Sequence, residues 1–242
     1  MNLSFVQIQH VSKVFNTPYG PVHALKDVSL GIRKGQLVAV TGKSGSGKST
    51  FLNVLTGIDK PTRGSVNIDG LQVENMNEDR LAAWRGKNIG IVFQFFQLLP
   101  TLTIAENIML PMDLCHTMKR ADRRDRAMSL LGQVDILEQA NKFPSMLSGG
   151  QQQRAAIARA LANDPPVIVA DEPTGNLDSH TAEAIFRLFE DVSSAGKTVV
   201  LVTHEKEFSS RFRGVVTFSD GELIDASGVE VAIDQRSEGG RT

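Results

Sequence analysis

The sequence predicts an α/β fold in which a parallel sheet is covered by helices on both faces. Three observations support this. Continuous apolar runs typical of buried strands, at residues 89–93, 167–170 and 198–203, alternate with segments of helical periodicity. A glycine-rich loop joins another apolar run to a helical segment. Two carboxylates directly follow residues 167–170, at the sheet edge where α/β proteins bind ligands.

The first third of the chain is predicted to be rich in strands. Polar and apolar residues alternate over 5–11 and again over 65–70, where an Asp-Gly pair ends the run. We expect strands at the N-terminal end of the chain, on the evidence of these two segments. The apolar run at 37–40 predicts a buried strand, and residues 50–55 predict the first turns of a helix.

The middle of the chain is predicted to be mostly helical. This part covers residues 104–162, with a charged amphipathic stretch at 120–131 and an alanine-rich stretch at 149–162. Residues 182–192 predict a further helix. From Ser227 onward the chain is rich in Gly, Ser and charged residues, so we expect a loosely ordered tail.

Bulk composition restricts the classes of function. The chain has 242 residues, enough for one large or two small domains, and its net charge of −1 gives no overall electrostatic reason to bind nucleic acid or an anionic membrane surface. The single cysteine, Cys115, excludes an internal disulfide and a cysteine-based zinc site, and it is expected to be a small buried apolar residue. No apolar run is long enough to span a membrane, so a cytosolic chain is expected unless another protein holds it at a membrane.

Residues 42–49 fit the pattern G-x-x-x-x-G-K-[ST] of a phosphate-binding loop, between a predicted strand and a predicted helix. Glycines let backbone N–H groups turn towards a phosphate, and the helix N-terminus adds partial positive charge. Lys48 would reach the β- and γ-phosphates, and the Ser49 hydroxyl would bind Mg²⁺. A flexible Gly/Ser loop is the alternative. The residues expected to bind nucleotide are Gly42, Ser44, Gly45, Ser46, Gly47, Lys48, Ser49 and Thr50.

The acidic pair Asp171 and Glu172 would lie beside this loop, because both residues follow a buried strand. Asp171 has the position of the acidic residue that holds Mg²⁺, and Glu172 could act as the general base on an attacking water. A carboxylate pair that merely caps the loop before Pro173 is the alternative.

A second helix N-terminus could also bind an anion. Residues 147–151, Leu-Ser-Gly-Gly-Gln, open the alanine-rich helix; Ser148 is a good N-cap, and two glycines free the backbone to approach a phosphate. A plain helix cap is an equally physical interpretation, and the residues by themselves do not decide between the two.

The phosphate loop, the Leu-Ser-Gly-Gly-Gln pentapeptide and the apolar strand before Asp-Glu, in this order and spacing, resemble the ATP-binding subunit of an ABC transporter. The resemblance covers about residues 5–225. It implies a P-loop NTPase core with a parallel sheet, an N-terminal antiparallel β subdomain and a helical signature subdomain. The expected domain spans residues 1–226, with the helical subdomain at about 97–162, followed by a polar tail at 227–242.

The resemblance also assigns individual residues. Gln94 matches a glutamine that touches Mg²⁺ and senses the γ-phosphate, and His204 matches a histidine that contacts the γ-phosphate. Phe15 matches the aromatic residue that stacks on adenine; a core aromatic is the alternative. The implied catalytic residues are Glu172, His204, Lys48 and Gln94; the implied Mg²⁺ ligands are Ser49, Gln94 and Asp171; and the implied additional ATP contacts are Phe15, Ser148, Gly149, Gly150, Gln151 and Asp178.

The family arrangement implies the partners. Two copies would pair head to tail around two ATP molecules, so that the pentapeptide of each copy serves the nucleotide of the other. The pair would power an integral membrane permease and lie at the cytoplasmic face of the inner membrane; no nucleic-acid partner is expected.

Residues 93–100, 102–107 and 172–178 are similar to a sub-branch for lipoprotein release, macrolide export and antimicrobial-peptide resistance, whose permeases often transmit motion across the membrane. The apolar cluster Phe95, Phe96, Leu98 and Leu99 is either core packing or part of a groove for a cytoplasmic helix of the permease.

Two alternatives remain beside the transporter subunit. A soluble ABC protein acting on DNA or ribosomes would need insertions, or a second such domain, for which the chain has no room. An unrelated P-loop kinase would leave residues 147–151 unexplained.

Overall fold

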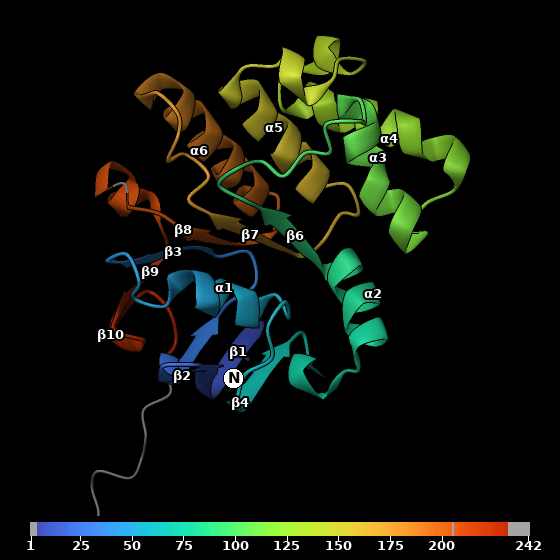
Figure 1. Ribbon diagram of the computed structural model, residues 1–242. Coiled ribbons are helices and arrows are strands. Elements are labelled where there is room, and N and C mark those ends of the chain that lie inside the picture. Colours follow the sequence, from blue (N-terminus) through green and yellow to red (C-terminus); the bar gives the residue numbers. More distant parts are fainter. Residues whose placement is uncertain (1–3, 205, 232–242) are drawn as a thin grey trace, which may run out of the picture.

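The computed structural model describes residues 4–204 and 206–231. Its central element is a six-stranded sheet with the order β10-β9-β3-β8-β7-β6, in which β10 alone is antiparallel to its neighbour. Figure 1 shows this sheet crossing the middle of the molecule. Its strands are β3 (Leu37–Gly42), β6 (Ile89–Val92), β7 (Val167–Asp171), β8 (Thr198–Val202), β9 (Gly214–Ser219) and β10 (Glu222–Ser227).

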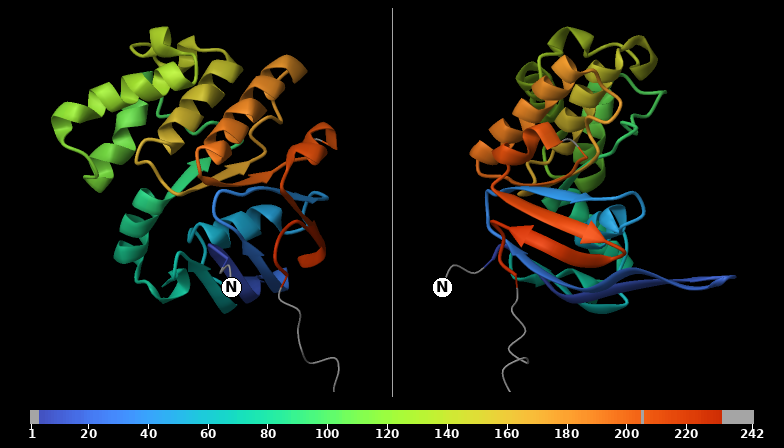
Figure 2. Two further views of the ribbon diagram at one scale, coloured as in Figure 1. Left: turned by 180° about the vertical axis from the view of Figure 1, so that it is seen from behind. Right: turned by 90° about the vertical axis from the view of Figure 1, so that its left-hand side faces the viewer.

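A second, antiparallel sheet has the order β2-β1-β4-β5 and confirms the predicted N-terminal β subdomain. Its strands are β1 (Val6–Thr17), β2 (Gly20–Ile32), β4 (Arg63–Ile68) and β5 (Leu71–Gln72). The hairpin of β1 and β2 is long and extends away from the body of the molecule (Figure 2). The strand β2 is mostly exposed over its first residues and buried toward its end at Ile32, and it was not predicted.

The two faces of the six-stranded sheet belong to different apolar cores. In β8, Val200 and Val202 pack with the antiparallel sheet, whereas Val199 and Leu201 pack with the helical segments. Side chains alternate across a strand, so a strand buried on both faces must be apolar throughout. This explains why the parallel strands are continuous apolar runs.

Helices cover both faces of this sheet (Figure 1). The helix α1 (Lys48–Leu55) packs into the core shared with the antiparallel sheet, and α2 (Glu78–Asn88) follows β5. The opposite core contains residues of α3 (Ile104–Cys115), α4 (Arg120–Gln133), α5 (Gly149–Ala160) and α6 (Ser179–Ser194). The predicted α/β fold and its mostly helical middle are therefore confirmed.

Some predicted boundaries change. The helix α6 begins three residues before the predicted one, because Asp178 caps its first turn. The ordered chain continues past the expected start of the tail at Ser227, since Glu230 forms two backbone hydrogen bonds with Gly31. Cys115 is half-buried at the end of α3, so the expectation of a buried residue is only partly met. The last part of the predicted tail, residues 232–242, lies outside the described residues.

Candidate functional site

The phosphate loop connects β3 to α1, and its backbone requires glycine. Gly42, Gly45 and Gly47 have φ angles of 140°, 77° and 103°, a region that residues with a side chain rarely adopt. A Cβ on Gly42 would lie 2.3 Å from the Phe218 carbonyl oxygen, and one on Gly47 would lie 2.5 Å from that of Ala24. The tight loop is therefore built against β9 and β2 and is not a flexible Gly/Ser linker.

Two polar side chains of this loop are buried. Lys48 is only 6% exposed, and its ammonium donates hydrogen bonds of 2.9 Å each to the carbonyl oxygens of Gly42 and Lys43. The Ser46 hydroxyl is buried and has no hydrogen-bond partner within the described part of the chain. A buried hydroxyl without a partner is costly, so this loop offers a donor for oxygen atoms of a ligand.

Asp171 lies at the carboxyl end of β7, beside the first turn of α1. Burial raises the pKa of this carboxyl group, while a hydrogen bond from the Ser49 hydroxyl opposes that rise. Gln94 follows the neighbouring strand β6, and its amide nitrogen would lie 3.5 Å from a Cβ built on Gly175. The structure thus places Ser49 directly against Asp171, and Gln94 against the segment that follows Glu172.

Glu172 and His204 come from the ends of adjacent strands and form a direct pair. The Glu172 Oε1 atom lies 2.6 Å from the His204 Nε2 atom, and both side chains remain partly exposed. The backbone of Glu172 is left-handed, with φ 45°, and its N–H donates a 3.0 Å hydrogen bond to the Val202 carbonyl oxygen. The strand that precedes His204 therefore fixes the turn that carries Glu172.

A cavity of about 500 Å³ opens over the phosphate loop. Predicted residues on its wall include Ser44, Gly45, Gly47, Lys48, Ser49, Thr50 and Glu172. The opposite wall was not predicted and is formed by Val22, His23, Ala24, Lys26, Asp220 and Gly221. Gly221 joins the two walls, because its N–H donates to the Ser46 carbonyl oxygen and its own carbonyl oxygen accepts from the Lys26 backbone N–H. No local pattern marks these residues, since they reach the loop only through sheet pairing.

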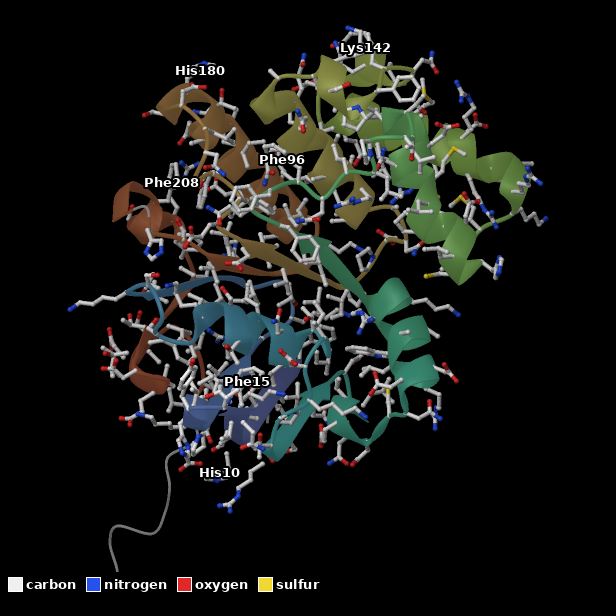
Figure 3. All side chains as sticks on the ribbon, in the orientation of Figure 1. His10, Phe15, Phe96, Lys142, His180 and Phe208 are labelled. Carbon is white, nitrogen blue, oxygen red and sulfur yellow. The ribbon has the colours of Figure 1, made fainter. Side chains whose placement is uncertain are left out.

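Phe15 lies on β1 opposite Val22, which lines this cavity. Its side chain is 37% exposed and belongs to neither apolar core, so the interpretation as a core aromatic is wrong. The Lys13 ammonium lies 4.9 Å from the ring centroid and donates a 2.8 Å hydrogen bond to the Lys60 carbonyl oxygen. Phe15 thus offers a partly exposed aromatic ring on the strand beside Val22, and Figure 3 labels it at the antiparallel sheet.

The predicted contacts on α5 do not line the cavity. Ser148 and Gln151 form a reciprocal capping box, in which the Ser148 hydroxyl accepts from the Gln151 N–H and the Gln151 side chain accepts from the Ser148 N–H. Gly150 leaves room for Thr181, whose Cγ2 atom would lie 2.6 Å from a Cβ on Gly150. Asp178 caps α6, and hydrogen bonds from Thr181 lower the pKa of its carboxyl group.

The apolar cluster after Gln94 divides between its two interpretations. Leu98 packs partly against the helical core, whereas Phe95 is 69% exposed and Leu99 is also exposed. The packing of Leu98 supports the interpretation as core, and the exposure of Phe95 and Leu99 supports the interpretation as a docking surface. None of the helices in the described ranges is both long and apolar enough to cross a membrane.

Comparison with known proteins identifies the family. Residues 25–175 match the family model described as "ABC transporter". An uncharacterised ABC transporter ATP-binding protein of Methanocaldococcus jannaschii, MJ0796, is 44% identical over 222 residues, which cover 90% of this chain and 94% of the relative. The macrolide export ATP-binding/permease protein MacB of Agrobacterium fabrum is 42% identical over 224 residues, but this chain covers only 34% of its length.

Solved structures agree with the sequence relatives. The dimeric, post-hydrolysis state of the MJ0796 cassette bound to ADP and Pi has a TM-score of 0.86 and 42% identity, covering 92% of this chain and 97% of that chain. The cavity, the phosphate loop and the Glu172–His204 pair therefore belong to a protein whose relatives share both sequence and fold over nearly the whole chain. The chain is an ATP-binding cassette ATPase and belongs to the ABC transporter family.

Proposed function

We propose that two copies of this chain close around two ATP molecules and use their hydrolysis to drive a membrane permease related to exporters of the MacB type. The observation that carries the proposal is the Glu172–His204 pair at the edge of a phosphate-loop cavity. A plain nucleotide-binding module would need the loop but not a carboxylate paired with a histidine beside it.

The residues of the chain divide the chemistry between them. Lys48 would leave its two carbonyl partners to neutralise the β- and γ-phosphates, and the Ser46 hydroxyl would gain a partner. Glu172 would accept a proton from the attacking water, because a carboxylate within hydrogen-bond reach of that water can act as a general base. His204 would orient Glu172 and contact the γ-phosphate. Phe15 would stack on adenine, since its aromatic face is exposed near the cavity.

The oxygen donors suit Mg²⁺. Ser49, Asp171 and Gln94 offer a hydroxyl, one carboxylate and one amide oxygen, and the described residues contain no cluster of three or more His, Cys, Asp or Glu that would make a complete protein cage. Magnesium usually combines one or two carboxylates with water and substrate phosphates. When bound, it would neutralise the charge that develops on the phosphoryl oxygens.

The second copy would complete each site. Ser148, Gly149, Gly150 and Gln151 lie at an exposed helix N-terminus outside the cavity, which suits a contact with the γ-phosphate held by another subunit. Asp178 would lie near this contact between subunits. The dimeric structures of MJ0796 support this pairing. We also assign residues 1–226 as the ATP-binding domain.

An apolar groove supports the permease partner. It has a volume of about 820 Å³ and is lined mainly by α2, β6, α3 and the end of α5. Leu114, at its rim, is 72% exposed, and Phe93 and Leu110 also line it. A cytoplasmic helix of the permease would fit such a groove through its apolar face and would hold the subunit at the cytoplasmic side of the membrane.

The test combines hydrolysis with capture of the partner. We expect the chain to hydrolyse ATP only when Mg²⁺ is present, and to copurify from membranes with a permease. Leu114→Glu should abolish copurification, because a charge would enter the apolar groove, and should leave hydrolysis by the isolated subunit unchanged. Leu137→Glu, at another exposed leucine, is the matched control. ATP-dependent capture of ribosomes or DNA in place of a permease would contradict the proposal.

A further inference from the structure

Arg159, in the last turn of α5, forms two hydrogen bonds with the loop that follows Gln94. Its Nη2 atom donates a 2.8 Å hydrogen bond to the Phe96 carbonyl oxygen, and its Nη1 atom donates to the carbonyl oxygen of Gln97. No carboxylate among the described residues pairs with this guanidinium, and burial lowers its pKa. A partly buried cation with only backbone acceptors is costly, and its two hydrogen bonds fix the loop on which they end.

The loop that is bound by Arg159 has an unusual backbone. Phe96 and Gln97 are consecutive left-handed residues, with φ angles of 54° and 51°, and the Gln97 N–H donates a 2.5 Å hydrogen bond to the Phe95 carbonyl oxygen. Such conformations are unfavourable for residues other than glycine and persist only where surrounding contacts enforce them. The two hydrogen bonds from Arg159 end on these two residues, so Arg159 supplies that enforcement.

This loop places the Phe96 ring at the N-terminal end of α5. A Cβ built on Gly149 would lie 3.8 Å from the Phe96 Cζ atom and 3.8 Å from a methyl carbon of Leu177. Figure 3 shows Phe96 on the segment after β6, beside the helical part of the molecule. Phe96 therefore links the two ends of one helix: its carbonyl is held by the last turn, and its ring lies against the first.

We propose that Arg159 is a positioning residue that, through the Phe96 ring, sets the position of Gly149 and hence of the ATP contact made to the other subunit. The inference rests on the proposed function, because it assigns the α5 N-terminus to the partner's nucleotide. Its specific content is the direction of the effect. Loss of the Arg159 hydrogen bonds should impair the ATP site that α5 of the same chain completes in the dimer. It should spare the other ATP site, which contains the phosphate loop of that chain.

The test uses full-length subunits with two different affinity tags, so that defined heterodimers can be isolated. In each heterodimer one copy carries Lys48→Ala, which leaves a single working site. That site combines the phosphate loop of the intact copy with α5 of the Lys48→Ala copy. Arg159→Lys keeps the charge but loses the fork that reaches two carbonyl oxygens at once. It is placed either in the copy with Lys48→Ala or in the opposite copy, and single-turnover ATP hydrolysis is measured.

We expect a loss of up to about a hundredfold when Arg159→Lys shares a chain with Lys48→Ala, since small misplacements near a reacting group cost this much. We expect no loss when it is in the opposite copy. Phe96→Ala should show the same asymmetry. Arg154→Lys is the matched control on the same helix, because Arg154 donates a 2.8 Å hydrogen bond to the Val134 carbonyl oxygen instead of the loop. It should affect neither heterodimer.

The outcomes are separable. Equal losses in both placements, or a loss only in the opposite copy, would overturn the inference, because Arg159 would then act on the fold or on its own nucleotide. If Arg159→Lys does not fold, Phe96→Ala carries the same comparison. The reference heterodimer with Lys48→Ala alone tests the proposed function: a single turnover is expected there. Its absence would mean that one site cannot act without the other, and the two placements would then be compared by the ATP held per cross-linked dimer.

Discussion

The chain carries two helix N-termini that we assign to phosphate, and they are built in opposite ways. At α1 the loop is buried against two strands, Lys48 is almost inaccessible, and the Ser46 hydroxyl lacks a partner. At α5 the N-terminus is exposed, and the capping box of Ser148 and Gln151 already satisfies its first donors. The first is a pocket prepared for a ligand. The second is a stable helix end that gains a ligand only when another molecule brings one.

The strongest test of this difference separates the two ends between subunits. Lys48→Ala removes the charge of the phosphate loop, and Ser148→Arg places a bulky cation where a γ-phosphate must approach. Each homodimer has both sites damaged, so we expect neither to hydrolyse ATP. A mixture should regain one intact site per heterodimer, measured by single-turnover hydrolysis and ATP-driven dimerisation.

If heterodimers form but hydrolysis does not return, cross-linked heterodimers should be assayed for bound ATP. One tightly held ATP per dimer would still support a shared site. None would mean that each chain uses its own α5 N-terminus.

The next largest effect concerns chemistry at the α1 end. Glu172→Gln keeps the shape of the side chain and removes its basicity, so turnover should fall by about 10²–10⁴-fold. ATP binding should remain, and the closed dimer should accumulate. Steady-state ATPase and size-exclusion chromatography with ATP measure both results. Glu138→Gln, at an exposed glutamate outside the cavity lining, is the control, and normal turnover in Glu172→Gln would refute the assignment.

A smaller effect is expected at Phe15, which pairs with the cavity residue Val22 on the neighbouring strand. Phe15→Ala should weaken ATP binding by roughly 1–3 kcal/mol, the scale of stacking between a base and an aromatic ring. Phe15→Tyr should change little, because the π-face is kept. Isothermal titration gives the affinities, and thermal unfolding serves as the control. An unchanged affinity in the alanine variant would exclude Phe15 from the nucleotide site.

The smallest effect concerns the cap that Asp178 places on α6. Hydrogen bonds from Thr181 lower the pKa of Asp178, so its ionised form stabilises α6 above its unfolded pKa, and that stability is lost as pH falls through the lower folded value. Asp178→Ala should therefore reduce the free energy of unfolding at neutral pH, with a difference that shrinks below about pH 4. Urea unfolding across this range measures it, and Asp178→Asn, which keeps a cap, should lose less.

The sequence by itself determined the family and the parallel strands β3, β6, β7 and β8, whereas β2, β9 and β10 were not predicted. The apolar runs at β6, β7 and β8 indicate strands buried on both faces, and the order and spacing of residues 42–49, 147–151 and 171–172 indicate the family. These features are local, because side-chain alternation, turn glycines and helix caps depend on residues a few positions apart. Resemblance then supplied roles that local physics leaves open, such as that of His204.

The tertiary structure decided which distant residues meet. The 2.6 Å contact of Glu172 with His204 depends on β7 and β8 being neighbours, and the wall formed by residues 22–26 and 220–221 depends on how β2 and β10 pack beside the phosphate loop. The hydrogen bonds from Arg159 to Phe96 and Gln97 join residues more than sixty positions apart. Strand order and loop packing are set by the summed burial of two cores, which no short stretch of sequence contains.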